Sequence, residues 1–249
     1  MTYLKRQSGL MRGLIGFLIC IFLWQIATQV LSLPKFILPS PFDVFTRVYS
    51  RFPILIYHAW VTLQEMLLGL GLGLGIGFLL SVQMLWFKSI RNWLLPLIII
   101  SQALPVFAIA PIMMLWLGYG IASKVVMAAI IIFFPITSCC FDGISSTPTH
   151  YLDLSKTLGA SKWQQLLFIR LPAALPAIAS GIRISVVIAP IGAIAGEWVG
   201  SSEGLGYLML QANARMMVDD MFAALFLLSC MSILLYQLTD KLLKRCIYW

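Results

Sequence analysis

The chain has 249 residues and a net charge of +8, and 61% of its residues are hydrophobic while only 10% are charged. Soluble domains are roughly half apolar and a quarter charged, so this composition excludes a fold with a wholly water-facing surface. The apolar residues fall in runs of about 20 residues, the length of a membrane-crossing helix, whereas a barrel would show shorter alternating segments. The sequence therefore predicts an all-α, polytopic membrane protein.

The positive charge does not indicate nucleic-acid binding, because no basic stripe is interleaved with aromatic residues that could stack on bases. In a membrane protein, Lys and Arg collect in cytoplasmic loops instead. The five cysteines lie in or beside apolar runs or in the basic tail. They indicate apolar packing rather than a disulfide framework.

Six membrane spans are predicted in chain order. They cover residues 10–31, 60–86, 93–117, 121–141, 177–199 and 221–238. The first span is longer than the apolar region of a signal peptide, and no small-x-small cleavage site follows it. We therefore interpret it as an anchor, and we expect residues 1–249 to form a single membrane domain.

Lys and Arg are distributed unevenly between the two sets of loops. If the N-terminus is cytoplasmic, the inner set is Lys5, Arg6, Arg12, Lys88, Arg91, Lys156, Lys162, Arg170, Lys241, Lys244 and Arg245. The outer set is then Lys35, Arg47, Arg51, Lys124 and Arg215. Because positive residues favour the cytoplasmic side, both termini are predicted to be cytoplasmic.

Two spans contain residues that affect helix packing. Gly69, Gly73 and Gly77 stand four residues apart in the second span, which predicts close approach of another helix. No strand precedes these glycines, so a phosphate-binding loop is not indicated. The third span contains three prolines, with Pro105 near its centre. These predict a kinked helix that either lines a polar path or simply packs against its neighbours.

The longest polar stretch on the predicted cytoplasmic side covers about 142–171. Thr147 is predicted to cap the start of a first short helix, and Gly159 is predicted to end it. Apolar residues recur along that helix at Tyr151, Leu154 and Leu158. This stripe predicts an amphipathic helix displayed beside the membrane.

A second short helix is predicted to begin with a capping box at Ser161 and to run to Arg170, stopping at Pro172. An amphipathic helix in this position either lies on the lipid headgroups or docks on a soluble partner. The polar face is weakly basic and includes Asp153, which favours the partner.

The segment from Asp153 to Pro172 resembles the EAA motif of binding-protein-dependent ABC importer permeases. That motif reads E-A-A, three residues, G, nine residues, I, one residue, L-P. The residues in register with it are Gly159, Ile169, Leu171 and Pro172. The sequence departs from the motif at its start, where Asp153, Leu154 and Ser155 replace E-A-A, although Asp153 keeps the carboxylate.

The resemblance covers nearly the whole chain and implies a type I importer permease in the bacterial inner membrane. Its implied partners are ABC ATPase subunits, a second permease copy forming a homodimer, and a periplasmic or lipid-anchored substrate-binding protein, with lipid around the spans. The residues expected to couple to the ATPase are Tyr151, Asp153, Leu154, Leu158, Gly159, Ala160, Ser161, Ile169, Leu171 and Pro172.

This chain is expected not to be an enzyme and to bind no cofactor or metal. It has no G-x-x-x-x-G-K-[ST] motif, so ATP and Mg²⁺ are expected on the ATPase subunits. Its two histidines, His58 and His150, are not part of H-E-x-x-H, and there is no G-x-S-x-G motif. Neither zinc nor serine chemistry is therefore indicated.

The branch that this sequence resembles most imports nitrate, sulfonates, taurine and pyrimidine precursors of thiamine. Segments 102–111 and 196–206 look most like permeases for the hydroxymethylpyrimidine precursor. Two different interpretations stay open, namely a permease for sulfonate, taurine or nitrate, and a secondary transporter. A secondary transporter usually shows inverted repeats and a paired ion site within the membrane, and neither is evident in the sequence.

Four polar residues in the spans are candidates for the translocation path, because such residues are costly in a membrane. Gln102 lies beside the prolines of the third span and is the preferred candidate. Glu65 either faces the path or lies at a solvated boundary, and Arg183 either faces it or extends to the headgroups. Glu197 ends the fifth span. The polar residues of the loop after it either contact the binding protein, gate the path or simply belong to a solvated loop, and they are Glu203, Asn213 and Arg215.

Overall fold

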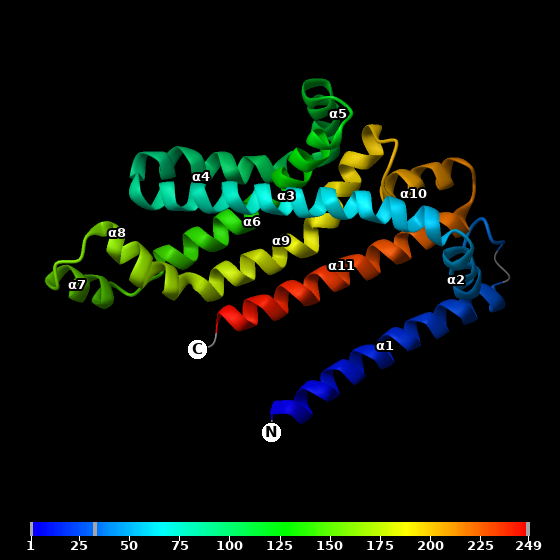
Figure 1. Cartoon of the computed structure of the whole chain (residues 1–249), viewed down its shortest axis with the longest axis horizontal. Helices are drawn as coiled ribbons and strands as arrows, with labels where there is room; N and C mark the ends of the chain where they lie inside the picture. The colour runs from blue at the N-terminus through cyan, green and yellow to red at the C-terminus, as the bar shows by residue number, and fades with distance from the viewer. Residues whose placement is uncertain (1, 32–33, 248–249) are drawn as a thin grey trace.

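The long helices of this chain run side by side in an elongated bundle, and shorter helices connect them at both ends (Figure 1). The computed structural model describes residues 2–31 and 34–247, without the side chains of residues 2–14 and 17. Within those ranges every regular element is helical, so the all-α prediction is confirmed.

The longest helices are α1 (Thr2–Val30), α3 (Phe52–Trp86), α6 (Ile121–Ser145), α9 (Leu171–Gly200) and α11 (Val218–Cys246). Shorter helices are α2 (Pro41–Ser50), α4 (Lys88–Ala103), α5 (Val106–Leu117), α7 (Thr149–Thr157), α8 (Lys162–Gln165) and α10 (Leu205–Ala214). A π-helix, η1 (Leu166–Arg170), joins α8 to α9.

Helices α3, α6 and α11, and the continuous stretch Lys162–Gly200, are each long and apolar enough to cross a membrane. They match the second, fourth, sixth and fifth predicted spans, although α3 begins at Phe52 instead of residue 60. The first predicted span coincides with α1, in which Leu18–Val30 forms a shorter apolar helix among the described side chains.

The third predicted span is broken rather than merely kinked. Its two halves, α4 and α5, are bent by 103°. Leu104 and Pro105 at the break have extended backbone angles, with ψ of 127° and 119°. Proline disfavours helical geometry in the residue before it and lacks a backbone donor, so the helix ends at Ala103 and restarts at Val106.

Helix α6 is the centre of the bundle because glycines let α3 approach it closely. A Cβ built on Gly73 would lie 2.8 Å from Cγ2 of Ile132, and one built on Gly69 would lie 2.5 Å from Cβ of Ala128. Gly77 meets the next turn of α6 in the same way, whereas Gly71 has nothing within 4 Å. The predicted packing role of Gly69, Gly73 and Gly77 is confirmed.

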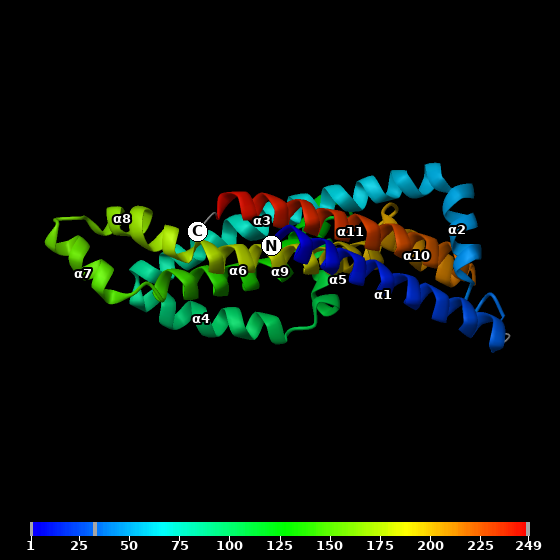
Figure 2. The ribbon, with the colours of Figure 1, turned by 90° about the horizontal axis from the view of Figure 1, so that it is seen from below.

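Helix α9 packs against α6 by the same means. A Cβ on Gly192 would lie 2.6 Å from Cα of Ala128, and one on Gly196 would lie 3.0 Å from Cα of Lys124. Figure 2 shows α3, α6 and α9 overlapping along the bundle, with α1 running along one side. The bundle is thus built around a three-helix core held by contacts between small residues.

The predicted outer end is closed by α2, which runs across the ends of the long helices in both views (Figures 1 and 2). Ser40 and Asp43 form a capping box at its start. The Lys35 ammonium and the Ser40 hydroxyl hold the pKa of the Asp43 carboxyl below its usual range. Arg47 pairs with Asp220 on α11 at 2.7 Å.

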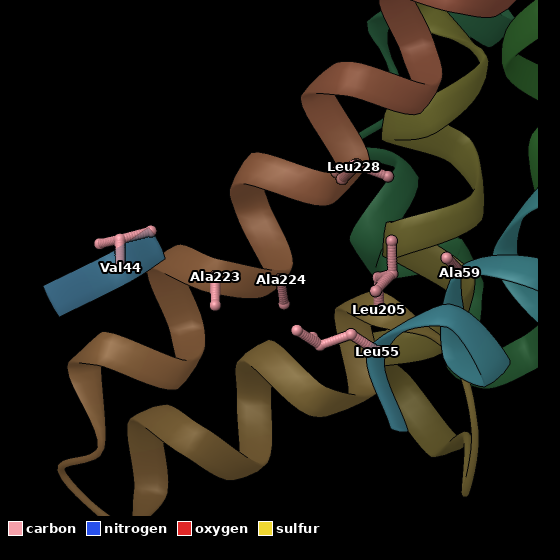
Figure 3. Close-up of a cluster of buried hydrophobic side chains, with 7 residues drawn as sticks. All are labelled: Val44, Leu55, Ala59, Leu205, Ala223, Ala224 and Leu228. Atoms are coloured by element: carbon pink, nitrogen blue, oxygen red, sulfur yellow. The ribbon is translucent and has the colours of Figure 1, made fainter. Parts of the chain in front are cut away.

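Below these ion pairs lies an apolar cluster that joins α2, α3, α10 and α11. Figure 3 shows its members on these helices, with Leu55 reaching toward Ala224: Val44, Leu55, Ala59, Leu205, Ala223, Ala224 and Leu228. Because each of these side chains is buried, the cluster packs the connection that contains α2 against the one that contains α10.

We predict that Gly73→Leu destabilises the protein, because its side chain would enter space that Ile132 occupies. Such overpacking lowers the free energy of unfolding by about 1–3 kcal/mol. The thermal midpoint of the detergent-purified chain, measured by size exclusion after heating, should fall accordingly. Gly71→Leu is the matched control, and an equal fall in both variants would contradict close packing at Gly73.

Candidate functional site

The predicted coupling segment forms two short helices at the end of the bundle opposite α2 (Figure 1). In α7, Leu152 and Ser155 are buried. The predicted stripe points the other way, since Tyr151, Leu154 and Leu158 are 52%, 60% and 78% exposed. A row of exposed leucines and a tyrosine on a water-side helix suits a partner with an apolar groove.

The two ends of α7 differ in how well the sequence predicts them. Gly159 has a φ of +79°, and the amide of Ala160 donates to the carbonyl of Ser155 at 2.9 Å, so the predicted glycine stop is confirmed. The predicted cap at Thr147 is wrong. Its hydroxyl donates back to the carbonyl of Ile144 at 3.1 Å, and Pro148 occupies the N-cap position.

The second helix begins as predicted, with a reciprocal capping box between Ser161 and Gln164. It does not stop at Pro172, because α8 passes through the π-helix η1 directly into α9. A π-turn inserts one extra residue, which accommodates a proline that has no backbone donor. Ile169 and Leu171 are partly buried on either side of this junction.

A cluster of buried charges lies between α3, α6 and α9, nearer the end of the bundle that carries α2. Glu65 is 0% exposed, and its Oε1 lies 3.1 Å from Nζ of Lys124. The Lys124 ammonium also donates to Oγ of Ser201 at 2.6 Å. The solvated-boundary interpretation of Glu65 is therefore wrong, and Lys124 is a buried residue of α6 rather than a solvated loop charge. The place of Glu65 in the translocation path stays a prediction.

Glu197 lies in the same region and is 1% exposed. Its Oε2 accepts hydrogen bonds from the backbone amides of Gly206 and Tyr207, at the start of α10. Its Oε1 accepts from the Thr62 hydroxyl at 2.6 Å, and Thr62 in turn accepts from the amide of Leu205 at 2.8 Å. A carboxylate at a helix N-terminus is favourable, so Glu197 fixes α10 to α3 and α9.

The loop between α9 and α10, residues 201–204, fits closely around the Glu197 carboxylate. Gly204 has a φ of +108°, and a Cβ there would collide with the Glu197 carboxyl group. The Gly204 amide donates to Nδ1 of His58 at 2.9 Å, and the Tyr57 hydroxyl donates to Glu203 at 2.9 Å. Glu197 is therefore a buried residue that holds the following loop in place, and its role in the translocation path stays a prediction.

The other two path candidates lie elsewhere. Gln102 is exposed near the end of α4, just before the break, and its amide contacts only Ser101, at 3.4 Å, among the described residues. Arg183 on α9 pairs with Asp240 on α11, with 2.9 Å between Nε and Oδ1. The structure thus brings together Glu65 and Glu197 but neither Gln102 nor Arg183. The roles of Gln102 and Arg183 in transport stay predictions.

Thr62, Lys124 and His58 belong to the buried network, but the sequence did not identify them as members. Lys124 lies 59 positions from Glu65 (124 − 65) and 73 from Glu197 (197 − 124), so no local pattern joins them. The sequence contains one indication of this network. Glu65, Lys124 and Glu197 each lie inside or beside an apolar run, where a charged side chain needs a partner. Among the described residues, no group of three or more His, Cys, Asp or Glu side chains is placed to hold a metal ion.

We predict that Lys124→Met strongly destabilises the chain, because it leaves the Glu65 carboxylate buried without a countercharge. Breaking a buried ion pair costs about 3–5 kcal/mol. The double variant with Glu65→Gln removes both charges and should recover much of that loss. The midpoint of denaturation in SDS, followed by circular dichroism, measures both variants. A double variant no more stable than Lys124→Met would refute the pairing.

Long apolar helices packed around a small-residue core, with short connecting helices at both ends, are the architecture of a polytopic helical membrane protein. Residues 69–246 match the family model described as "Binding-protein-dependent transport system inner membrane component", and the chain belongs to that family. It is therefore a permease subunit of an ABC importer, as the resemblance of its EAA-like segment predicts.

Several known proteins are similar to the chain over most of its length. A probable ABC transporter permease protein of Haemophilus influenzae is 50% identical over 92% of this chain and 94% of its own length. The formylaminopyrimidine transport permease protein ThiX of Halalkalibacterium halodurans is 36% identical over 99% of this chain and 98% of its own. The riboflavin transport system permease protein RibX of Chloroflexus aurantiacus is 35% identical over 91% and 85%.

The fold is also similar to that of a solved transporter. A chain of the MetNI methionine ABC transporter, in an inward-facing conformation, superposes with a TM-score of 0.68 and 20% identity. The superposition covers 79% of this chain and 97% of that one. At this level of identity the likeness concerns the fold alone, and it confirms the predicted importer permease fold.

Proposed function

We propose that two copies of this chain form the transmembrane pathway of an importer for a pyrimidine precursor of thiamine. A periplasmic or lipid-anchored binding protein delivers the substrate to the end that carries α2 and α10. ATPase subunits bind the end that carries α7, and both termini lie on that cytoplasmic side. The exposed stripe of Tyr151, Leu154 and Leu158 on α7 is the observation that carries the coupling role.

ATP and Mg²⁺ act on the ATPase subunits in this proposal, since the chain contains no phosphate-binding loop. Closure of the ATPases displaces α7, and the displacement reaches the spans through the connections at both ends of the segment. On one side α7 follows α6 after a short break, and on the other α8 and η1 continue into α9. The spans thereby alternate between inward-facing and outward-facing arrangements.

The substrate assignment is supported by the likeness to ThiX over nearly the whole chain and by segments 102–111 and 196–206. Segment 196–206 covers the end of α9, the following loop and the start of α10, and Glu197 and Gly204 bond it to Thr62 and His58 on α3. The riboflavin permease RibX is almost as similar, so riboflavin is the principal competing substrate. Sulfonates, taurine and nitrate are further candidate substrates.

We predict that the double variant Leu154→Asp with Leu158→Asp loses its ATPase subunits but keeps its fold, because both side chains are exposed. Co-purification with the tagged ATPase should fall at least tenfold, while the thermal midpoint of the chain stays unchanged. Thr157→Asp, on an exposed position of the same helix, is the control and should retain the ATPase. Full co-purification of the double variant would refute the docking role.

We predict that cells lacking this permease lose uptake of radiolabelled hydroxymethylpyrimidine and regain it when the gene is returned. Riboflavin and taurine uptake, measured in the same strains, should not change. Uptake in vesicles should also require ATP and persist when ion gradients are collapsed. If only riboflavin uptake is restored, riboflavin is the substrate and the pyrimidine assignment is wrong. Transport without ATP would refute the importer mechanism itself.

A further inference from the structure

An open cavity of about 410 Å³ lies between the end of α3 and the coupling segment, and neither the apolar stripe of α7 nor the buried charges line it. Its walls come from Leu85 and Trp86 on α3, Lys156 on α7, Ala160 in the loop after α7, and Lys162, Gln165 and Arg170 on the α8–η1 stretch. Three of these seven residues are cationic, and none is acidic.

Hydrogen-bond donors exceed acceptors in this cavity. Lys156 pairs with Asp153 at 3.0 Å, but no carboxylate of the described residues lies within 4.0 Å of Lys162 or Arg170. The Arg170 guanidinium donates one bond, to the carbonyl of Ile144 at 3.3 Å, and keeps further N–H groups available. Gln165 is only 7% exposed, and its amide reaches the carbonyl of Ala160 only at 3.5 Å. The cavity therefore suits an anion with several acceptor oxygens.

The position of the cavity along the bundle indicates where that anion comes from. Trp86 ends the apolar helix α3, and its ring centroid lies 5.3 Å from that of Trp163 on α8. Exposed tryptophans mark the level of the lipid headgroups. Leu167 and Phe168 lie in the π-helix η1 together with Arg170, and they are 38% and 74% exposed, so the segment that carries this cation also presents apolar surface for acyl chains.

We propose that this cavity binds the phosphate of an anionic phospholipid headgroup through Lys162 and Arg170, with Lys156 and Gln165 beside them. Basic pockets at the cytoplasmic membrane surface bind such headgroups. The bound phosphate joins the end of α3 to α7 and to the start of α9, which orders the coupling segment. This consequence for coupling rests on the proposed function, whereas lipid binding does not.

Two other negatively charged groups match the cationic cavity, namely an acidic side chain of the ATPase and free phosphate. An acidic side chain of the ATPase is disfavoured because the exposed apolar face of α7 does not line the cavity, to which α7 contributes only Lys156. Free phosphate matches the cations but leaves the tryptophan pair and the exposed Phe168 without a role. A phospholipid contacts all three features at once.

The test is native mass spectrometry of the full chain, purified in non-ionic detergent and titrated with phosphatidylglycerol or phosphatidylcholine. We expect tighter retention of phosphatidylglycerol, and an affinity on the order of tenfold lower in Lys162→Gln with Arg170→Gln. Lys88→Gln with Arg91→Gln removes two exposed charges from the start of α4 and is the charge-matched control. It should change the affinity less than twofold.

The single variant Lys162→Gln, at an exposed position, is measured as well, because Arg170 also bonds the backbone of α6. The proposal would be overturned if the cavity pair and the control pair lost the same affinity for phosphatidylglycerol. It would also be overturned if the unmodified chain retained phosphatidylglycerol and phosphatidylcholine equally. Displacement of the lipid by millimolar inorganic phosphate would assign the site to a free anion. Unchanged lipid affinity with loss of the ATPase would assign it to an acidic partner. Failure of the lipid test leaves the ATPase co-purification result of Leu154→Asp with Leu158→Asp unaffected.

Discussion

The lack of side chains at Gly69, Gly73 and Gly77 is the constraint on which the rest of the structure depends. It allows α3 to lie directly on α6, while Gly192 and Gly196 allow α9 to do the same. Only at such short separations can Glu65 reach Lys124, and the Glu197 carboxylate reach Thr62. Association of helices in lipid gains little from the hydrophobic effect, so close contact and these paired polar groups hold the core together.

The two ends of the bundle are built differently. At the end that carries α2, Glu197 caps α10 and Arg47 pairs with Asp220 on α11, so these buried or half-buried charges are matched within the chain. At the end that carries α7, Leu154 and Leu158 are exposed. The observed contacts therefore hold the first end together within the chain, whereas the second presents the exposed leucines on which the proposed docking of the ATPase rests.

Local signals in the sequence predicted local structure well. The glycine spacing of α3, the stop at Gly159 and the capping box at Ser161 each depend on residues within a few positions, and each is confirmed. The pairing of Glu65 with Lys124 depends on helix register across the bundle, which no single span specifies. The continuation through Pro172 was missed because a π-turn has no distinct sequence signal.

The continuous helix from Lys162 to Gly200 has a mechanical consequence. It contains 39 residues, which at about 1.5 Å per residue makes a rod roughly 58 Å long. It is continuous through the π-helix η1, Pro176 and Pro190, whereas α4 and α5 are bent by 103°, so its two ends are joined by unbroken helix. A rotation of about 5° moves one end by roughly 5 Å relative to the other at this length. The start of this helix, which follows α7, and Glu197 near its far end therefore lie on one continuous helix that is longer than the roughly 40–45 Å thickness of a membrane with its headgroups.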